Sequence, residues 1–181
     1  MILTHTSPEG KIDKIKSRND DSIFLFDGIF ASEGWTSDYT TNANFDTHFE
    51  IDDDLIAGPG DADLNYDETI KFLKKEYPNL NNNELEILYN LVAEDEDIRD
   101  CIEDDCTNIP FLPLKYKKHY EDREEALYNI DGDILSDLSW KFQNIRGQIA
   151  INQGFSAIAM SDEFGISFFI PYTAKYKIVK E

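Results

Sequence analysis

The chain has 181 residues, of which 41% are hydrophobic and 13% aromatic, and this composition excludes a protein that is disordered as a whole. Its net charge of −20 argues against binding to nucleic acids or anionic lipids, because both rely on lysine and arginine. No apolar run reaches membrane-spanning length and the first residues do not resemble a signal peptide, so we expect neither a membrane span nor secretion.

Short β-prone runs open the chain. Residues 2–5 predict a strand, and the Pro-Glu-Gly sequence at 8–10 predicts a turn. Ile12 and Ile15 follow at helical spacing.

The next segment predicts two strands hinged at an Asp-Gly turn. The strands are expected over 23–26 and 29–32. Residues 33–50 are polar with spaced aromatic residues and predict a helix that packs these rings inward. The Asp- and Gly-rich run over 52–60 predicts a loop.

The middle of the chain is acidic and helical in pattern. A helix is expected from Asp67, closed by Pro78, and a second helix is expected to be capped by Asn82 or Asn83. A third, over 94–105, has one narrow apolar stripe. These segments predict an acidic helical insertion at about 67–130, because residues 19–138 carry 32 acidic and 8 basic residues.

The carboxy-terminal part has the clearest pattern. Apolar residues at helical spacing predict a helix over 137–152, which Gly154 ends. Strands are expected over 155–160 and 166–170, joined by a link in which Gly165 has a positive φ, and a last strand over 173–179. Strands thus cluster at both ends of the chain. We predict an α+β fold in which two small packed β-sheets, with flanking helices, bring these ends together in a single domain, 1–181.

If the two ends meet, polar and aromatic residues from both could line one cleft. Histidine and serine can bond ribose hydroxyls, an aromatic ring can stack on nicotinamide, and a carboxylate can stabilise the cation that grows as a glycosidic bond breaks. The residues in question are His5, Ser7, Phe30, Ser32 and either Asp162 or Glu163. The alternative is that the two acids are ordinary turn residues, His5 a structural histidine and Phe30 a core residue.

Several segments resemble a family of phage proteins. Trp140-Lys-Phe-Gln143, Ile145-Arg-Gly147, Gly154-Phe155 and Met160-Ser-Asp-Glu-Phe-Gly165 follow one another at spacings similar to those of the anti-CRISPR ADP-ribosyltransferases that inhibit type I-F CRISPR systems. Leu3-Thr-His-Thr-Ser7, Gly28-Ile-Phe-Ala31 and Leu64-Asn-Tyr66 resemble earlier elements of that family. Thr6 stands where the family usually has glycine, and Phe164 where it usually has histidine.

The resemblance implies an ADP-ribosyltransferase-like fold, NAD as the substrate, and a Cas protein or CRISPR surveillance complex as the target in the host bacterial cytoplasm. Asp162 corresponds to the catalytic acid of the family, with Glu163 as the alternative. The cofactor-binding residues implied are His5, Thr6, Ser7, Phe30, Ala31, Tyr39 and Arg146. Arg146 could instead pair with a local acid.

Two other functions fit parts of the sequence. An acidic protein can imitate nucleic acid and block a basic groove without catalysis, and a transferase of this kind can also act as a toxin on the host cell. Metal binding is not expected, because Asp131-Gly132-Asp133 lacks the rest of a calcium loop and Cys101 and Cys106 lack further zinc ligands.

Overall fold

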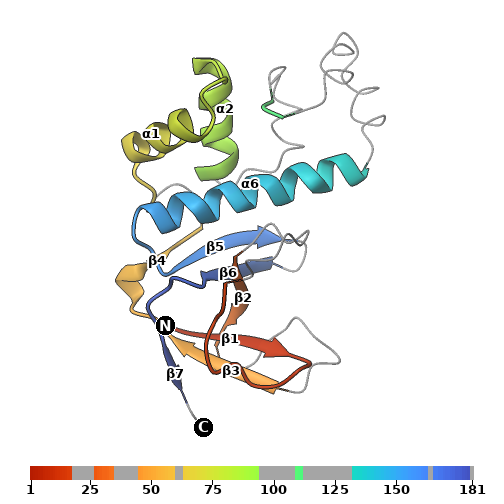
Figure 1. Cartoon of the computed structure of the whole chain (residues 1–181), viewed down its shortest axis with the longest axis vertical. Helices are drawn as coiled ribbons and strands as arrows, with labels where there is room; N and C mark the ends of the chain where they lie inside the picture. Colours follow the sequence, from red (N-terminus) through yellow and green to blue (C-terminus); the bar gives the residue numbers. More distant parts are fainter. Residues whose placement is uncertain are drawn as a thin grey trace. The chain divides into compact units, whose positions relative to one another are not determined.

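The computed structural model describes residues 1–17, 27–34, 45–59, 63–93, 109–111, 132–162 and 165–179 (Figure 1). The chain divides into two compact units. A sheet unit consists of Met1–Asp63 and Ala150–Glu181, and a helical unit consists of Leu64–Ile149. Among the described residues, no helix is long and apolar enough to cross a membrane.

The sheet unit contains seven strands within the described residues, in the order β4-β5-β6-β2-β1-β3-β7. Neighbouring strands are antiparallel except β4 and β5, which are parallel. The strands are β1 (Ile2–Ser7), β2 (Gly28–Glu33), β3 (Phe45–Glu50), β4 (Ile56–Ala57), β5 (Ala157–Asp162), β6 (Gly165–Pro171) and β7 (Lys177–Val179).

Strands from the two ends of the chain pair with each other, as predicted. β2 pairs with β6 through Ile29 and Ile170, and β3 pairs with β7 through Glu50 and Lys177. The last of these pairs also brings Lys177 Nζ within 3.6 Å of Glu50 Oε2. The α+β class is confirmed.

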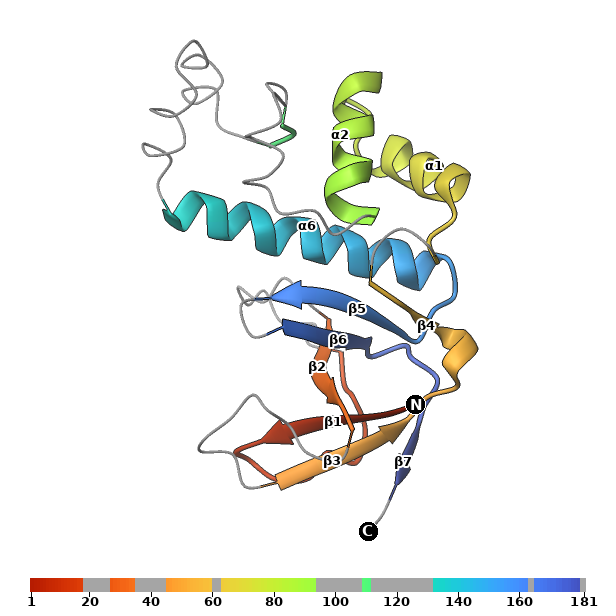
Figure 2. The same ribbon diagram turned by 180° about the vertical axis from the view of Figure 1, so that it is seen from behind.

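The sheet consists of two halves that share one core. β1 and β2 are joined by only two register pairs, whereas β1 and β3 pair along six residues. One cluster of buried residues includes Leu3 and Phe49 from one half and Ala159, Phe168 and Ile170 from the other. The two halves (Figure 2) therefore correspond to the two small packed sheets expected from the sequence.

Two helical predictions near the amino terminus were wrong. Residues 11–17 form no helix, because the Ile12 amide donates to Thr47 Oγ1 at 2.9 Å and the Ile15 amide donates to Tyr176 Oη at 2.8 Å. Residues 45–50, expected to end a helix, form β3 instead, between β1 and β7. The strand expected at 23–26 lies outside the described residues, and so do residues 35–44 of the helix expected over 33–50.

The loop expected over 52–60 contains two short elements. Asp53–Leu55 is a single 3-10 turn, and Ile56–Ala57 is β4. β4 is held by parallel pairing with Ala157 and Ile158, which are about a hundred residues away in the sequence. Local composition therefore could not reveal it.

In the helical unit, α1 (Tyr66–Glu76) and α2 (Asn82–Ala93) begin where asparagine caps them. Asn65 Oδ1 accepts from the Glu68 amide at 3.0 Å, and Asn81 Oδ1 accepts from the Glu84 amide at the same distance. The cap of α2 is thus Asn81, one residue before the predicted positions. The two helices are joined by an edge-to-face contact between Tyr66 and Tyr89, with ring centroids 4.8 Å apart.

The next helix among the described residues, α6 (Gly132–Asn152), begins five residues earlier than predicted, and its residues 150–152 belong to the sheet unit. The predicted apolar positions Leu138, Phe142, Ile145 and Ile149 are all buried. Gly154 follows with φ +91, and Gly165 at the start of β6 has φ +123. The predicted helix end and β5–β6 hairpin are therefore confirmed, while the helix predicted over 94–105 lies outside the described residues.

Gly28 is required by close packing between β2 and β6. A Cβ at this position would lie 2.3 Å from the carbonyl oxygen of Ile170 and 2.7 Å from the Phe169 ring. We expect Gly28→Ala to lower the free energy of unfolding by about 1–3 kcal/mol, measured by urea denaturation. Gly132→Ala is the matched control, because a Cβ there meets nothing within 4 Å. Equal stabilities of the two variants would contradict the expectation.

Candidate functional site

His5 lies in β1, and a side-chain contact fixes its ring. The distance between His5 Nδ1 and the Phe30 carbonyl oxygen in β2 is 2.6 Å. Because a carbonyl oxygen only accepts, Nδ1 carries the proton in this contact, and the neutral ring has its lone pair on Nε2. The contact links β1 to β2 beyond their two register pairs.

Thr6 and Ser7, the next two candidates, complete β1. The Thr6 hydroxyl donates to Asp46 Oδ1 in β3 at 2.5 Å. Ser7 Oγ accepts from the Glu9 amide at 3.2 Å. Both side chains are half-buried and belong to the same half of the sheet as His5.

Phe30 and Ala31 differ in their surroundings. The half-buried Phe30 ring lies 5.4 Å from the Phe169 ring, at an interplanar angle of 46°. Ala31 is 2% exposed and belongs to the core cluster. The Ala31 methyl group is therefore a packing group, whereas Phe30 presents part of its surface.

Asp162 is the last residue of β5, and its backbone pairs with Gly165 at the start of β6. Its side chain lies outside the part that the structure describes, as do Glu163 and Tyr39 entirely. The strand order β5-β6-β2-β1 brings the hairpin and the β1–β2 candidates onto four adjacent strands. The Phe30–Phe169 pair lies four residues along β6 from Gly165, or about 13 Å.

Arg146 is in the helical unit and fully buried. Its Nη1 donates to the carbonyl oxygen of Val92 at 3.0 Å and also to that of Ala93, at the carboxy-terminal end of α2. A guanidinium enclosed in this way is not accessible to a pyrophosphate. We therefore leave Arg146 out of the candidate nucleotide site.

A row of buried polar residues crosses β2, β1 and β3, and sequence reasoning identified only one member of it, Ser32. Thr4 is in register with Ser32 on one side and with His48 on the other. The Thr4 hydroxyl donates to the Gly34 carbonyl oxygen at 2.5 Å, and Thr4 Oγ1 lies 2.8 Å from His48 Nδ1. Since the hydroxyl has one proton, His48 Nδ1–H must be the donor to Thr4.

Ser32 Oγ is buried and has no hydrogen-bond partner among the described residues. Buried hydroxyl groups are normally paired, so an unpaired one indicates a missing partner. Ser32 is the register partner of Thr4 and lies two residues from Phe30. It is therefore a candidate for a hydrogen bond to a ligand hydroxyl.

The Thr4 contacts yield a stability prediction. Thr4→Val keeps the shape of the side chain but leaves His48 Nδ1–H without its acceptor and the Gly34 carbonyl without its donor. We expect the free energy of unfolding to fall by about 1–3 kcal/mol, measured by urea denaturation. Thr173→Val, at an exposed turn, is the control and should change little. A Thr4→Val protein as stable as this control would contradict the assignment.

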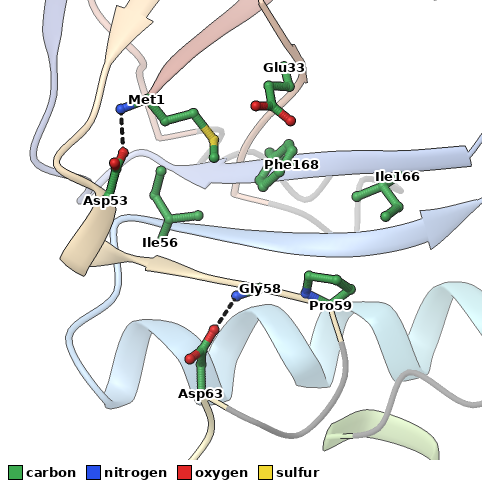
Figure 3. Close-up of a pocket in the computed structure, with 9 residues that line it drawn as sticks. All are labelled: Met1, Glu33, Asp53, Ile56, Gly58, Pro59, Asp63, Ile166 and Phe168. Carbon is green, nitrogen blue, oxygen red and sulfur yellow. Dashed lines mark hydrogen bonds and ion pairs between the residues drawn. The ribbon is translucent and has the colours of Figure 1, made fainter.

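A separate open pocket of about 350 Å³ lies within the sheet unit (Figure 3). Its wall combines apolar side chains with three carboxylates. The lining residues are Met1, Glu33, Asp53, Ile56, Gly58, Pro59, Asp63, Ile166 and Phe168.

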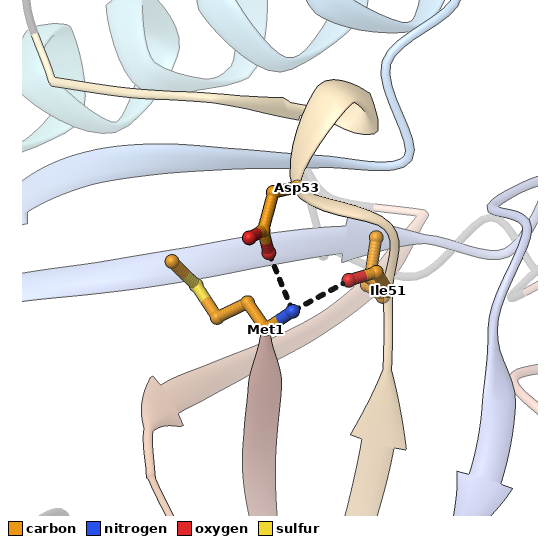
Figure 4. A network of polar contacts seen from close by, with 3 residues as sticks. All are labelled: Met1, Ile51 and Asp53. Atoms are coloured by element: carbon orange, nitrogen blue, oxygen red, sulfur yellow. Dashed lines mark hydrogen bonds and ion pairs between the residues drawn. The ribbon is translucent and has the colours of Figure 1, made fainter.

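Two contacts order one side of this pocket. The Met1 amino group donates to the Ile51 carbonyl oxygen at 2.8 Å and to Asp53 Oδ1 at 2.5 Å (Figure 4). Asp63 Oδ2 accepts from the Gly58 amide at 2.6 Å. None of the pocket residues was a candidate from the sequence, because they come from separate parts of the chain: the residue before β1, β2, the segment from the 3-10 turn to Asp63, and β6.

Among the described residues, no group of three or more His, Cys, Asp or Glu side chains could hold a metal ion. Cys101 and Cys106 lie outside those residues.

The family comparison matches the part of the chain that includes the hairpin. A family model described as "Anti-CRISPR Type I-F ADP-ribosyltransferase AcrIF11" matches residues 114–178, which include α6, β5 and β6. Over these residues the chain is similar to the anti-CRISPR ADP-ribosyltransferases. The match to this family covers 65 of the 181 residues and includes Asp162.

Other comparisons add little detail. A solved structure described as "Crystal structure of an anti-CRISPR protein" is 17% identical, with a TM-score of 0.44, and the alignment covers 99% of this chain and 95% of that one. The comparison with curated proteins gives no match.

Proposed function

We propose that the protein is an NAD-dependent mono-ADP-ribosyltransferase that modifies and inactivates a component of a type I CRISPR surveillance complex in the host bacterial cytoplasm. The family match over residues 114–178 carries this proposal, because it includes the hairpin with Asp162. The strand order, in which that hairpin adjoins β2 and β1, supports it.

The described residues fit an NAD site at β1 and β2. The unpaired, buried Ser32 hydroxyl offers a partner for a ribose hydroxyl. The partly exposed Phe30 ring, two residues along β2, offers an aromatic surface, and the oriented His5 ring offers a polar group on the adjacent strand β1. Thr6 and Ser7 extend the site along β1, and Tyr39 is assigned to the nicotinamide pocket by resemblance alone. NAD supplies an activated glycosidic bond whose leaving group is neutral nicotinamide.

Asp162 is proposed as the catalytic carboxylate. As the bond from the ribose C1′ atom to the nicotinamide nitrogen breaks, the nitrogen keeps the electron pair and the ribose becomes an oxocarbenium ion. A fixed carboxylate stabilises this cation. The acceptor nucleophile then forms the new bond to C1′, and its proton passes to Asp162 or to solvent. Glu163 is the alternative residue for this role.

The first test is NAD binding and turnover. NAD should raise the melting temperature of the protein progressively with NAD concentration, because it binds the folded state. Inhibition of a type I-F surveillance complex should require NAD and should proceed at far less than one protein per complex. If NAD causes no thermal shift and inhibition does not require NAD, the proposal is contradicted.

The net charge of −20 favours a second candidate function, an acidic decoy that blocks a basic nucleic-acid groove. A decoy should inhibit stoichiometrically, ignore NAD and lose effect steeply with added salt. A toxin-type transferase would instead arrest growth when expressed alone in a host without a CRISPR system.

A further inference from the structure

The open pocket described above has a strongly negative rim. Glu33, Asp53 and Asp63 bring three carboxylates to it, and the Met1 amino group neutralises one of them through its contact with Asp53. An excess of two negative charges remains. A phosphate group would be repelled here, so this pocket does not suit the pyrophosphate of a dinucleotide.

The remainder of the pocket wall is apolar and open to solvent. Ile166 is 50% exposed, and Phe168 lies between it and Ile56 (Figure 3). The exposed part of Ile166 offers an apolar contact surface close to the carboxylates of the rim. Lysine and arginine match such a surface, because each combines an apolar stem with a cationic end.

We propose that this pocket docks an arginine or lysine side chain of the acceptor protein. The carboxylates of the rim favour a cationic group, and the apolar side chains of the pocket contact the aliphatic part of the arginine or lysine. The identity of the partner as the acceptor rests on the proposed transferase function. The subunits of a surveillance complex that bind nucleic acid carry basic surfaces, and such a pocket would recognise them.

The backbone register places the pocket next to the proposed catalytic hairpin. Ile166 follows Gly165, the register partner of Asp162, and is itself paired with Ser161. Ser161 and Ile166 share one face of the hairpin, and the neighbouring Asp162–Gly165 pair belongs to the other face, so a basic side chain held at Ile166 anchors the acceptor at the same end of the hairpin but on the opposite face. Docking here would hold the acceptor against the sheet without contributing to the bond-breaking step.

Binding can be tested without catalysis or NAD. Arginine amide is titrated into the isotope-labelled protein, and the Gly58 amide, which bonds Asp63, is followed by NMR. We expect saturable shifts at Gly58 and Ile166 that citrulline amide, whose side chain has nearly the same shape but no charge, does not produce. The double variant Glu33→Gln with Asp63→Asn should weaken binding at least tenfold, although asparagine still offers Gly58 an acceptor. Asp54→Asn, an exposed carboxylate outside the pocket, is the matched control.

The outcomes separate this proposal from the proposed function. No shift at the pocket, an equal shift with citrulline amide, or an equal loss in Asp54→Asn would overturn the docking site even if the protein is a transferase. Where transfer is measured, the double variant should raise KM for the protein acceptor at least fivefold and leave NAD hydrolysis unchanged. A loss of NAD hydrolysis in the folded double variant would also overturn docking, since it would assign the carboxylates to the nucleotide reaction.

Discussion

Asp162→Asn should lower kcat for ADP-ribose transfer by about 10²–10³-fold or more, with little change in stability. Asparagine has nearly the same shape as aspartate but lacks the negative charge that stabilises an oxocarbenium ion, and removing one preorganised electrostatic group typically costs this much. Asp162 ends β5 at a register pair with Gly165, so the substitution removes no described core contact. The rate is measured as NAD consumed and as ADP-ribose attached to the acceptor.

Glu163→Gln is the control for this loss, since Glu163 is the adjacent carboxylate in the same hairpin link. Full activity in Asp162→Asn together with loss in Glu163→Gln would transfer the catalytic role to Glu163. Full activity in both variants would contradict a catalytic carboxylate in this hairpin. An unchanged thermal unfolding curve establishes that a loss of activity in either variant does not come from unfolding.

Arg146→Met should cause the largest loss of stability. The fully buried guanidinium donates to the carbonyl oxygens of Val92 and Ala93, the last two residues of α2. Methionine fills much of the space but leaves both carbonyls without this donor, so the free energy of unfolding should fall by about 3 kcal/mol. The melting temperature should fall by about 6–12 °C.

Gln148→Ala, an exposed substitution two residues along α6, is the control and should change the melting temperature little. An Arg146→Met protein as stable as this control would contradict the structural role. Retained stability together with weakened NAD binding would instead restore the pyrophosphate contact that the resemblance implied for Arg146.

The parts of the fold that could be predicted are those with local signals. The β5–β6 hairpin is marked by Gly154 and Gly165, both of which adopt a positive φ. α1 and α2 are marked by asparagine caps and apolar spacing. These features depend on neighbours within a few residues, so a single sequence carries them.

The elements that were missed depend on distant partners. β3 was expected to be helical, yet it pairs with β1 and β7 at opposite ends of the chain. The Ile12 and Ile15 amides bond side chains of Thr47 and Tyr176 rather than helical carbonyls. No local pattern encodes these contacts.

The candidate site shows the same division. The hairpin position of Asp162 followed from the sequence, whereas the contact between the His5 ring and the Phe30 carbonyl oxygen was not foreseen. The Thr4–His48 pair and the acidic pocket were not foreseen either, because they form only when strands from both ends of the chain come together.

The most direct measurement of the central claim is intact-mass spectrometry of a purified type I-F surveillance complex incubated with the protein and NAD. We predict that one subunit gains the mass of ADP-ribose in the presence of wild-type protein, and that the gain is absent without NAD and with Asp162→Asn. Inhibition of the complex with no mass gain on any subunit would contradict the transferase function and leave the acidic decoy as the explanation.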